Sequence, residues 1–244
     1  MTTRNNEENE KPFSRAMVVV AHPDDAEFGC SGTVAKWCRL GWDVVYVMCT
    51  DGSKGTEDRN ITSAQLAEIR AQEQRDAGKV LGLKDVVFLG NPDGYLQPTL
   101  ELRRDISREI RRWKPDVLIT TNPVRNLSGS GYVGHPDHMA AGEAALSAVY
   151  PAARDHLTFP ELLEEGFEPH KVKEVWLMLG AEHADLYNPL EKQDVETAIK
   201  ALLAHASQIK DTERATERMW QGRAESGRNA GAEYAERFKV FRLN

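Results

Sequence analysis

Two short polar segments carry the side chains of this sequence that are best suited to binding a metal ion. The first has the sequence HPDD at residues 22–25, and the second has HPDH at residues 135–138. Catalytic zinc sites use three protein ligands drawn from His, Asp, Glu or Cys and leave a fourth position for water. Such segments also occur by chance, so neither predicts a metal site unless the fold brings the two together.

The residue types in the two segments suggest a division of roles. His22, Asp25 and His138 would form a set of two imidazoles and one carboxylate, which is typical of catalytic zinc. Asp24 lies beside that set without being needed as a ligand, so it would accept a proton from water. His135 would stabilise a developing oxyanion or protonate a leaving nitrogen. A metal, a base and an electrophilic donor together predict hydrolysis of an amide or ester.

The elements that must position these segments alternate between strands and helices. Strands are expected at residues 17–20, 43–50, 85–89, 116–121 and 173–179, and helices at residues 33–40, 62–82, 102–113, 139–149 and 191–209. Thr62 and Gln65 form a capping-box pattern that predicts one of the helix starts. This alternation predicts an α/β fold with a parallel sheet and right-handed crossovers.

The expected topology explains how two distant segments would meet. In an open parallel sheet, ligands bind beyond the carboxyl ends of the strands, where the strand order reverses. For the common order 3-2-1-4-5, that point lies between the loops after the first and fourth strands, residues 21–30 and 122–137. These loops contain the two polar segments. Their placement makes a shared metal site more plausible than two unrelated polar loops.

Length, composition and charge indicate a soluble globular protein. The chain has 244 residues, is 41% hydrophobic and carries a net charge of −7, so nucleic-acid binding is not expected. The longest aliphatic run, residues 16–21, is far shorter than the ~20 residues of a membrane span. The three cysteines are expected to be buried and reduced, which favours a cytoplasmic location: Cys30, Cys38 and Cys49. Residues 1–12 predict a disordered leader without a secretory signal, followed by a single domain over 13–244.

Several motifs in combination resemble one known family. The segment AHPDDAE at residues 21–27, followed by Gly32 and Thr33, resembles the AHPDDxE signature of the PIG-L/LmbE-like N-acetylglucosaminyl deacetylases. The segment at 135–138 resembles the second signature of that family. Residues 70–77 are similar to its RxxExxxA helix, and Asp93 with Gly94 to its loop after the third strand. The resemblance covers about residues 16–150, and residues 151–244 read as a C-terminal elaboration on which it says little.

The resemblance implies both a fold and a reaction. It implies a Rossmann-like, doubly wound sheet, a divalent metal that is most often zinc, and removal of an acetyl or acyl group from a small-molecule amino sugar. By the same resemblance, the metal ligands are His22, Asp25 and His138, the general base is Asp24, and the oxyanion stabiliser or acid is His135. A homo-oligomer, trimeric or hexameric, is also implied.

Other residues are assigned weaker roles. Arg70 and Asp93 would bind sugar hydroxyls by the same resemblance, and Asp137 would orient the ring of His135. Tyr132 would approach the substrate from the glycine-rich loop at residues 129–134. That loop matches GxGxxG but follows the fourth strand instead of the first, which argues against nucleotide binding.

Several alternatives stay open at this point. One is an amidase of the same family that acts on a thiol conjugate or on a non-sugar amide, and another is a non-catalytic metal- or sugar-binding module. Asp24 and His135 favour an enzyme, because binding alone does not require them. His205 is expected at a surface or interface, and the charges of the C-terminal segment, Arg223 among them, on a solvated face. For Arg70, an ion pair with Glu73 is the alternative to substrate binding.

Overall fold

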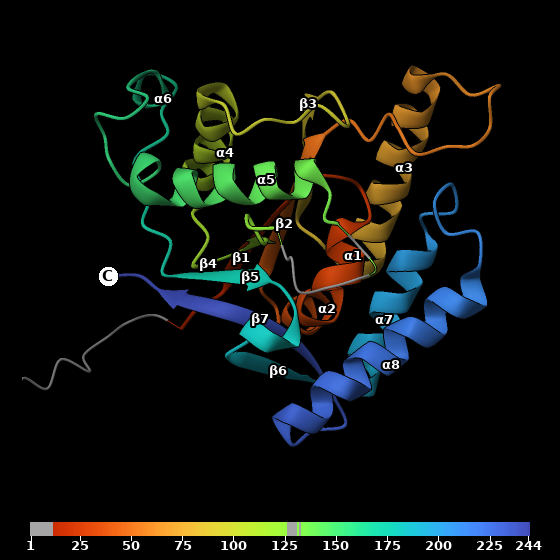
Figure 1. Cartoon of the computed structure of the whole chain (residues 1–244). Helices are drawn as coiled ribbons and strands as arrows, with labels where there is room; N and C mark the ends of the chain where they lie inside the picture. Colours follow the sequence, from red (N-terminus) through yellow and green to blue (C-terminus); the bar gives the residue numbers. More distant parts are fainter. Residues whose placement is uncertain (1–11, 126–130, 132) are drawn as a thin grey trace, which may run out of the picture.

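Seven strands form one sheet in the computed structural model, which describes residues 12–125, 131 and 133–244. The strands are β1 (Arg15–Val20), β2 (Asp43–Thr50), β3 (Asp85–Asn91), β4 (Val117–Thr121), β5 (Glu174–Met178), β6 (Leu186–Leu190) and β7 (Tyr234–Arg242). Their order is β3-β2-β1-β4-β5-β7-β6 (Figure 1). The first five in this order run parallel, and β7 is antiparallel to both of its neighbours. The predicted order 3-2-1-4-5 and the mostly parallel α/β sheet are therefore confirmed.

Helices cover both faces of the sheet. They are α1 (Asp25–Gly29), α2 (Ser31–Arg39), α3 (Ser63–Leu81), α4 (Leu100–Trp113), α5 (Pro136–Ser147), the π-helical turn η1 (Ala148–Ala152), α6 (Glu161–Glu164), the 3-10 turn η2 (Ala181–His183), α7 (Lys192–Leu203) and α8 (Thr212–Ala230). Helices α4 and α5 lie on one face, while α2, α3 and α7 lie on the other (Figure 1). This is a doubly wound arrangement.

The central strands are apolar throughout because they are buried on both faces. In β1, Met17 and Val19 pack with the core beneath α4 and α5. Their neighbours Val18 and Val20 point the other way, into the core beneath α2 and α3. This alternation is the two-residue period of a strand. A shift of β1 by one residue would exchange the side chains between the two cores, so the register of the strand, and with it the start of the following loop, is well defined.

The start and the end of α3 follow from local chemistry. The capping box predicted at Thr62 and Gln65 is confirmed: Thr62 Oγ1 accepts from the Gln65 amide at 3.3 Å, and Gln65 Oε1 accepts from the Thr62 amide at 2.9 Å. Gly82 ends the helix with φ 82°, a conformation that glycine adopts without steric cost. Helix α3 carries Arg70 and Gln74 toward the loop after β1.

The C-terminal elaboration differs from its prediction. The helix expected at 191–209 ends at Leu203, and the charge-rich end of the chain contains both α8 and β7. Strands β6 and β7 were not predicted, because Asn188 and Pro189 interrupt β6 and charged residues interrupt β7. Strand β7 inserts between β5 and β6, so this segment completes the sheet.

Two side chains of this segment are buried against expectation. Arg223 is not on a solvated face: it pairs with Glu236 at 2.8 Å, and both side chains are less than a tenth exposed. His205 was expected at a surface or interface and is fully buried. In both cases the side chain is paired with a carboxylate of another element, Glu236 of β7 for Arg223 and Glu27 of α1 for His205. The sequence does not show that these elements pack together. Pro12 is the one residue of the predicted leader that the structure describes, and none of the described helices is long and apolar enough to span a membrane.

Candidate active site

The loop after β1 is held in one conformation by hydrogen bonds from two directions. Asp25 Oδ2 accepts from the backbone amide of His22 at 2.9 Å, which folds the loop onto itself. Between them, Asp24 has φ 94° and ψ −24°, in the left-handed region that non-glycine residues seldom adopt. The backbone amide of Asp24 donates to Gln74 Oε1 of α3 at 3.1 Å. The first polar segment is therefore a strained but fully supported turn.

The second polar segment opens α5. His135 caps the helix, because its Nδ1 accepts from the backbone amide of Asp137 at 3.2 Å, and Pro136 occupies the first helical position. Thr121, at the end of β4, donates its hydroxyl to the carbonyl of His138 at 2.6 Å. Gly142 allows α5 to lie this close, because a Cβ there would come within 2.4 Å of the Thr121 carbonyl oxygen.

The structure brings donor atoms of three residues together, two from the first segment and one from the second. His22 Nδ1 lies 3.2 Å from His138 Nε2, which lies 3.0 Å from Asp25 Oδ1. Asp25 Oδ2 lies 3.4 Å from His22 Nδ1. Ligands bound tetrahedrally to zinc at ~2.0–2.1 Å are roughly 3.3 Å apart, so these spacings match a zinc-sized ion. The donor set of two imidazoles and a carboxylate fits a divalent metal in both chemistry and spacing.

The other ring nitrogen of His22 faces two further carboxylates. His22 Nε2 lies 3.1 Å from Asp93 Oδ1 and 3.2 Å from Asp137 Oδ2. Donor atoms of these three residues also lie within 4.8 Å of one another, as do donor atoms of His22, His135 and His138. A carboxylate that accepts the second N–H of an imidazole fixes the orientation of the ring and strengthens it as a metal ligand. Asp93 and Asp137 are therefore placed to orient His22 from behind.

Asp137 does not make the contact that the sequence suggested. Its carboxylate lies 4.0 Å from His135 Nδ1, which is beyond hydrogen-bond range. Instead it accepts from the backbone amides of Gly94 at 2.7 Å and Leu96 at 3.3 Å, in addition to facing His22. The reason is the position of Asp137 in the first turn of α5, where it points into the protein while His135 points outward.

The converging carboxylates favour a positive charge at this place. Burial opposes the charged form of His22, but the hydrogen bonds and charges of Asp25 and Asp93 outweigh it and raise its pKa to about 10. Burial also acts against the charge of Asp25, yet His138 and His22 hold the pKa of Asp25 well below its usual range. For Asp24, burial and then the charge of Asp25 raise the pKa from 3.8 to about 7, against the opposing effect of Arg70. His135 has a lowered pKa because of burial and the neighbouring imidazoles of His22 and His138.

Arg70, one of the residues expected to bind substrate, is bonded to backbone carbonyls of the protein. Arg70 is buried, and its guanidinium donates to the carbonyls of Pro23, Gly52 and Lys54 at 2.8–3.1 Å. Its Nη2 lies 3.5 Å from Asp24 Oδ2, so Arg70 holds the loops around the site and faces the expected base. The alternative pairing of Arg70 with Glu73 is absent among the described contacts, where Glu73 accepts from Ser207. Tyr132 lies outside the described residues.

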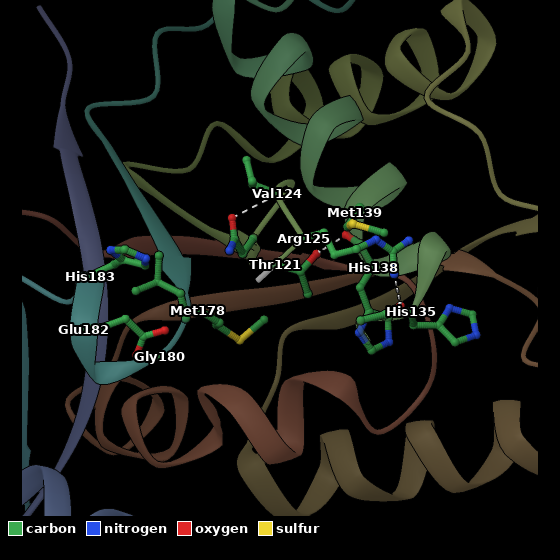
Figure 2. Close-up of a pocket in the computed structure, with 13 residues that line it drawn as sticks. Thr121, Val124, Arg125, His135, His138, Met139, Met178, Gly180, Glu182 and His183 are labelled. Atoms are coloured by element: carbon green, nitrogen blue, oxygen red, sulfur yellow. Dashed lines mark hydrogen bonds between the residues drawn. The ribbon is translucent and has the colours of Figure 1, made fainter. Parts of the chain in front are cut away.

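A cavity of about 740 Å³ opens beside the donor atoms (Figure 2). His135 and His138 form one side, Met178 lies between, and Gly180 and His183 form the opposite side. The volume lies within the ~300–1,000 Å³ typical of small-molecule sites. Sequence reasoning missed the contribution of residues 178–183, because the C-terminal elaboration carries no motif. It also missed Gln74, although its place four residues after Arg70 puts both on one face of a helix.

A doubly wound α/β sheet with this donor set at its switch point defines the chain as a candidate metal-site protein. Residues 17–149, more than half of the chain, match the PIG-L family, described as GlcNAc-PI de-N-acetylase. The chain belongs to the PIG-L family, which confirms the resemblance drawn from the motifs.

Individual relatives agree with that membership. The chain is 31% identical to the diacetylchitobiose deacetylase of Thermococcus kodakarensis, over 82% of this chain and 73% of that protein. It is 28% identical to a 1D-myo-inositol 2-acetamido-2-deoxy-α-D-glucopyranoside deacetylase of Rhodococcus erythropolis, over 80% of this chain and 81% of that protein. The solved structure of the N,N'-diacetylchitobiose deacetylase of Pyrococcus horikoshii matches with a TM-score of 0.85 and 26% identity, over 94% of this chain and 84% of that one.

Proposed function

We propose that this protein is a metal-dependent N-deacetylase that removes an acetyl group from an N-acetylglucosamine-type amino sugar. The observation that carries the proposal is the triangle of three side chains, His22, Asp25 and His138: the two imidazole nitrogens are 3.2 Å apart, and the Asp25 carboxylate turns one oxygen toward each of them at 3.0 and 3.4 Å. These residues would hold the metal, and two imidazoles with one carboxylate make zinc the most fitting ion. Such an ion would supply a Lewis acid for the acetamide carbonyl and would acidify a water.

Asp24 is the proton carrier in this proposal. Asp24 directly precedes Asp25 in the chain, and its carboxylate faces Arg70 at 3.5 Å, which keeps it oriented. As water adds to the acetamide carbon, Asp24 accepts the proton that the water loses. When the carbon–nitrogen bond breaks, the same proton goes to the leaving amine, so the products are acetate and a free amino sugar.

His135 is suited to stabilise the oxyanion and not to carry the proton. Because its Nδ1 accepts from the Asp137 amide, the ring proton lies on Nε2, which is free to donate. The ring lines the cavity, and its lowered pKa keeps it neutral near neutral pH. A neutral imidazole that already donates can strengthen its hydrogen bond as charge develops on the carbonyl oxygen. It cannot accept a proton at Nδ1 without losing the helix cap.

The substrate class is supported by the cavity and by the relatives. A cavity of about 740 Å³ beside His135 and His138 has room for a unit attached to the amino sugar. The relatives named for diacetylchitobiose and for an N-acetylglucosaminyl inositol both act on such conjugates. Assembly into a trimer or hexamer and a cytoplasmic location stay predictions, and light scattering of the purified protein tests the first.

The test is acetate release combined with metal analysis. The purified protein is assayed with N-acetylglucosamine, diacetylchitobiose and an N-acetylglucosaminyl inositol, and with a thiol-linked and a non-sugar N-acetyl amide as alternative substrates. We expect about one zinc per chain, acetate release from at least one amino sugar, loss of activity with a chelator, and recovery when zinc is restored. Release from the non-sugar amide alone would overturn the substrate class. Binding of zinc and sugar without any acetate release would indicate a binding module instead.

A further inference from the structure

A chain of three buried polar side chains lies behind Asp24. The backbone amide of Asp24 donates to Gln74 Oε1 at 3.1 Å, and Gln74 Nε2 donates to Glu27 Oε1 at 3.0 Å. The other carboxylate oxygen, Glu27 Oε2, lies 3.4 Å from Nε2 of His205. Gln74, Glu27 and His205 are all fully buried. None of them touches the three donor atoms, so they have no role as metal ligands.

The direction of each hydrogen bond in this series of side chains is fixed by the backbone amide of Asp24, where the series begins. A backbone amide can only donate, so Gln74 must turn its oxygen toward Asp24 and its NH₂ toward Glu27. A carboxylate meets that demand, because Glu27 offers only acceptors in its ionised form. An amide at position 74 can accept from the donor on one side and donate to the acceptor on the other. Neither an ionised glutamate nor an apolar residue there can do both.

The backbone of Asp24 needs this support. With φ 94°, it occupies a conformation that is strained in a non-glycine residue and persists only when the surroundings impose it. Asp24 also lies, with Pro23, between the two residues of the turn that supply donor atoms, His22 and Asp25. A shift of its backbone would move the carboxylate away from the reacting water, while the ligands keep their own hydrogen bonds.

The C-terminal elaboration anchors the far end of this chain. His205 follows α7, and the next turn is tied to α3 because Ser207 donates its amide and hydroxyl to Glu73 at 2.6 and 2.7 Å. Arg223 of α8 donates to the backbone carbonyl of Phe28, one residue after Glu27, at 3.2 Å. The segment that sequence motifs leave unassigned thus closes over the back of the turn.

We propose that Gln74 and Glu27 are positioning residues that hold Asp24 in its left-handed conformation and thereby aim its carboxylate. This inference rests on the proposed function of Asp24 as proton carrier. The hydrogen-bond polarity makes it specific: what matters is an amide facing a carboxylate, not merely two residues of the right size. The arrangement would work equally well with the two side-chain types exchanged, since a glutamate at 74 accepts from Asp24 and from an amide at 27.

The test exploits that exchange. Gln74→Glu places two carboxylates face to face, and we expect kcat to fall roughly 10–100-fold, a range typical for loss of a supporting partner, with KM and zinc content unchanged. Glu27→Gln alone is milder, because its carbonyl oxygen still accepts from Gln74. The double variant Gln74→Glu with Glu27→Gln restores the polarity and recovers most of kcat. Gln72→Glu, the same change at an exposed position of α3, is the matched control and leaves kcat unchanged.

A structural readout separates this inference from the proposed function. Crystal structures of the metal-free variants give φ of Asp24, which we expect to leave the left-handed region in Gln74→Glu and to return to it in the double variant. If Gln74→Glu does not fold, Gln74→Met serves in its place, with the same expected change at Asp24. An unchanged φ and kcat in the folded single variant, or failure of the double variant to recover, would overturn the inference. An inactive wild-type protein with the expected change of φ would overturn only the proposed function.

Discussion

The two loops that meet at the site differ in how deeply they are buried. The loop after β1 contributes His22 and Asp25, whose side chains are 8% and 10% exposed. The start of α5 contributes His138 and His135, which are 29% and 38% exposed and line the cavity. We call the first the buried wall and the second the open wall.

This difference teaches how rigidity and access are divided. Carboxylates behind the buried wall fix the ring of His22 before any ligand arrives, through Asp93 and Asp137 at 3.1–3.2 Å. The open wall is fixed mainly through its backbone, by the helix cap at His135 and the hydroxyl of Thr121. A site built this way keeps its geometry on one side and exchanges water and substrate on the other.

Removing a donor from each wall gives the largest expected effects and separates the walls. His22→Ala and His138→Ala should both lose zinc and turnover, because each removes one corner of the triangle. His22→Ala should destabilise the metal-free protein more, by about 3–5 kcal/mol, because Asp25 and Asp93 both lose a buried partner, whereas His138→Ala leaves His22 beside Asp25. Metal analysis and urea unfolding measure the two effects. Equal losses of stability in both variants would mean that the walls are equally rigid.

Asp24→Asn tests the chemical role of the buried wall without removing a donor atom. We expect kcat to fall about 10²–10⁴-fold, the usual contribution of a general base, because an amide cannot accept the proton. Zinc content should match the wild type, since Asp24 contributes none of the three donor atoms. Single-turnover acetate release and metal analysis are the measurements. A variant that keeps both its zinc and its rate would remove Asp24 from the mechanism.

Asp137→Asn gives the smallest expected effect and probes the support behind His22. The affinity for zinc should fall about 10–100-fold, because a neutral amide holds the ring N–H of His22 less strongly than a carboxylate does. Competition with a chromogenic chelator measures this affinity. His135→Gln on the open wall is the comparison, and it should lower kcat with unchanged zinc affinity. If His135→Gln weakened zinc binding instead, His135 would be a ligand and the division between the walls would fail.

The parallel half of the fold was predictable because its signals are local. β-branched runs such as residues 17–20, and caps such as Thr62 with Gln65, act within a few residues of one another. The two polar segments are also short, and the common strand order predicted that their loops would meet. The predictions failed where the partner lies on another element: Arg223 of α8 with Glu236 of β7, His205 with Glu27, and β7 between β5 and β6.

Asp137 illustrates the limit at a single residue. Its spacing from His135 suggested that it orients that ring, yet only its backbone amide bonds to the ring, and its carboxylate stays 4.0 Å from His135 Nδ1. Its partner is His22, more than a hundred residues earlier in the chain. Gln74 shows the converse, since its helix face was readable but nothing in the sequence named the backbone amide that it accepts from.

The amino-acid sequence by itself determined the order of strands and helices in the parallel part of the sheet, and the two polar segments with their chemistry, because hydrophobic period, capping and side-chain type are properties of short stretches. Tertiary structure alone decided which nitrogen of each imidazole faces the donor triangle, which carboxylates stand behind it, and how the C-terminal segment closes over Asp24. Those choices depend on differences of a few tenths of an ångström in the distances between residues far apart in the chain. Packing of the whole sheet and its helices sets such distances, and no short stretch encodes them.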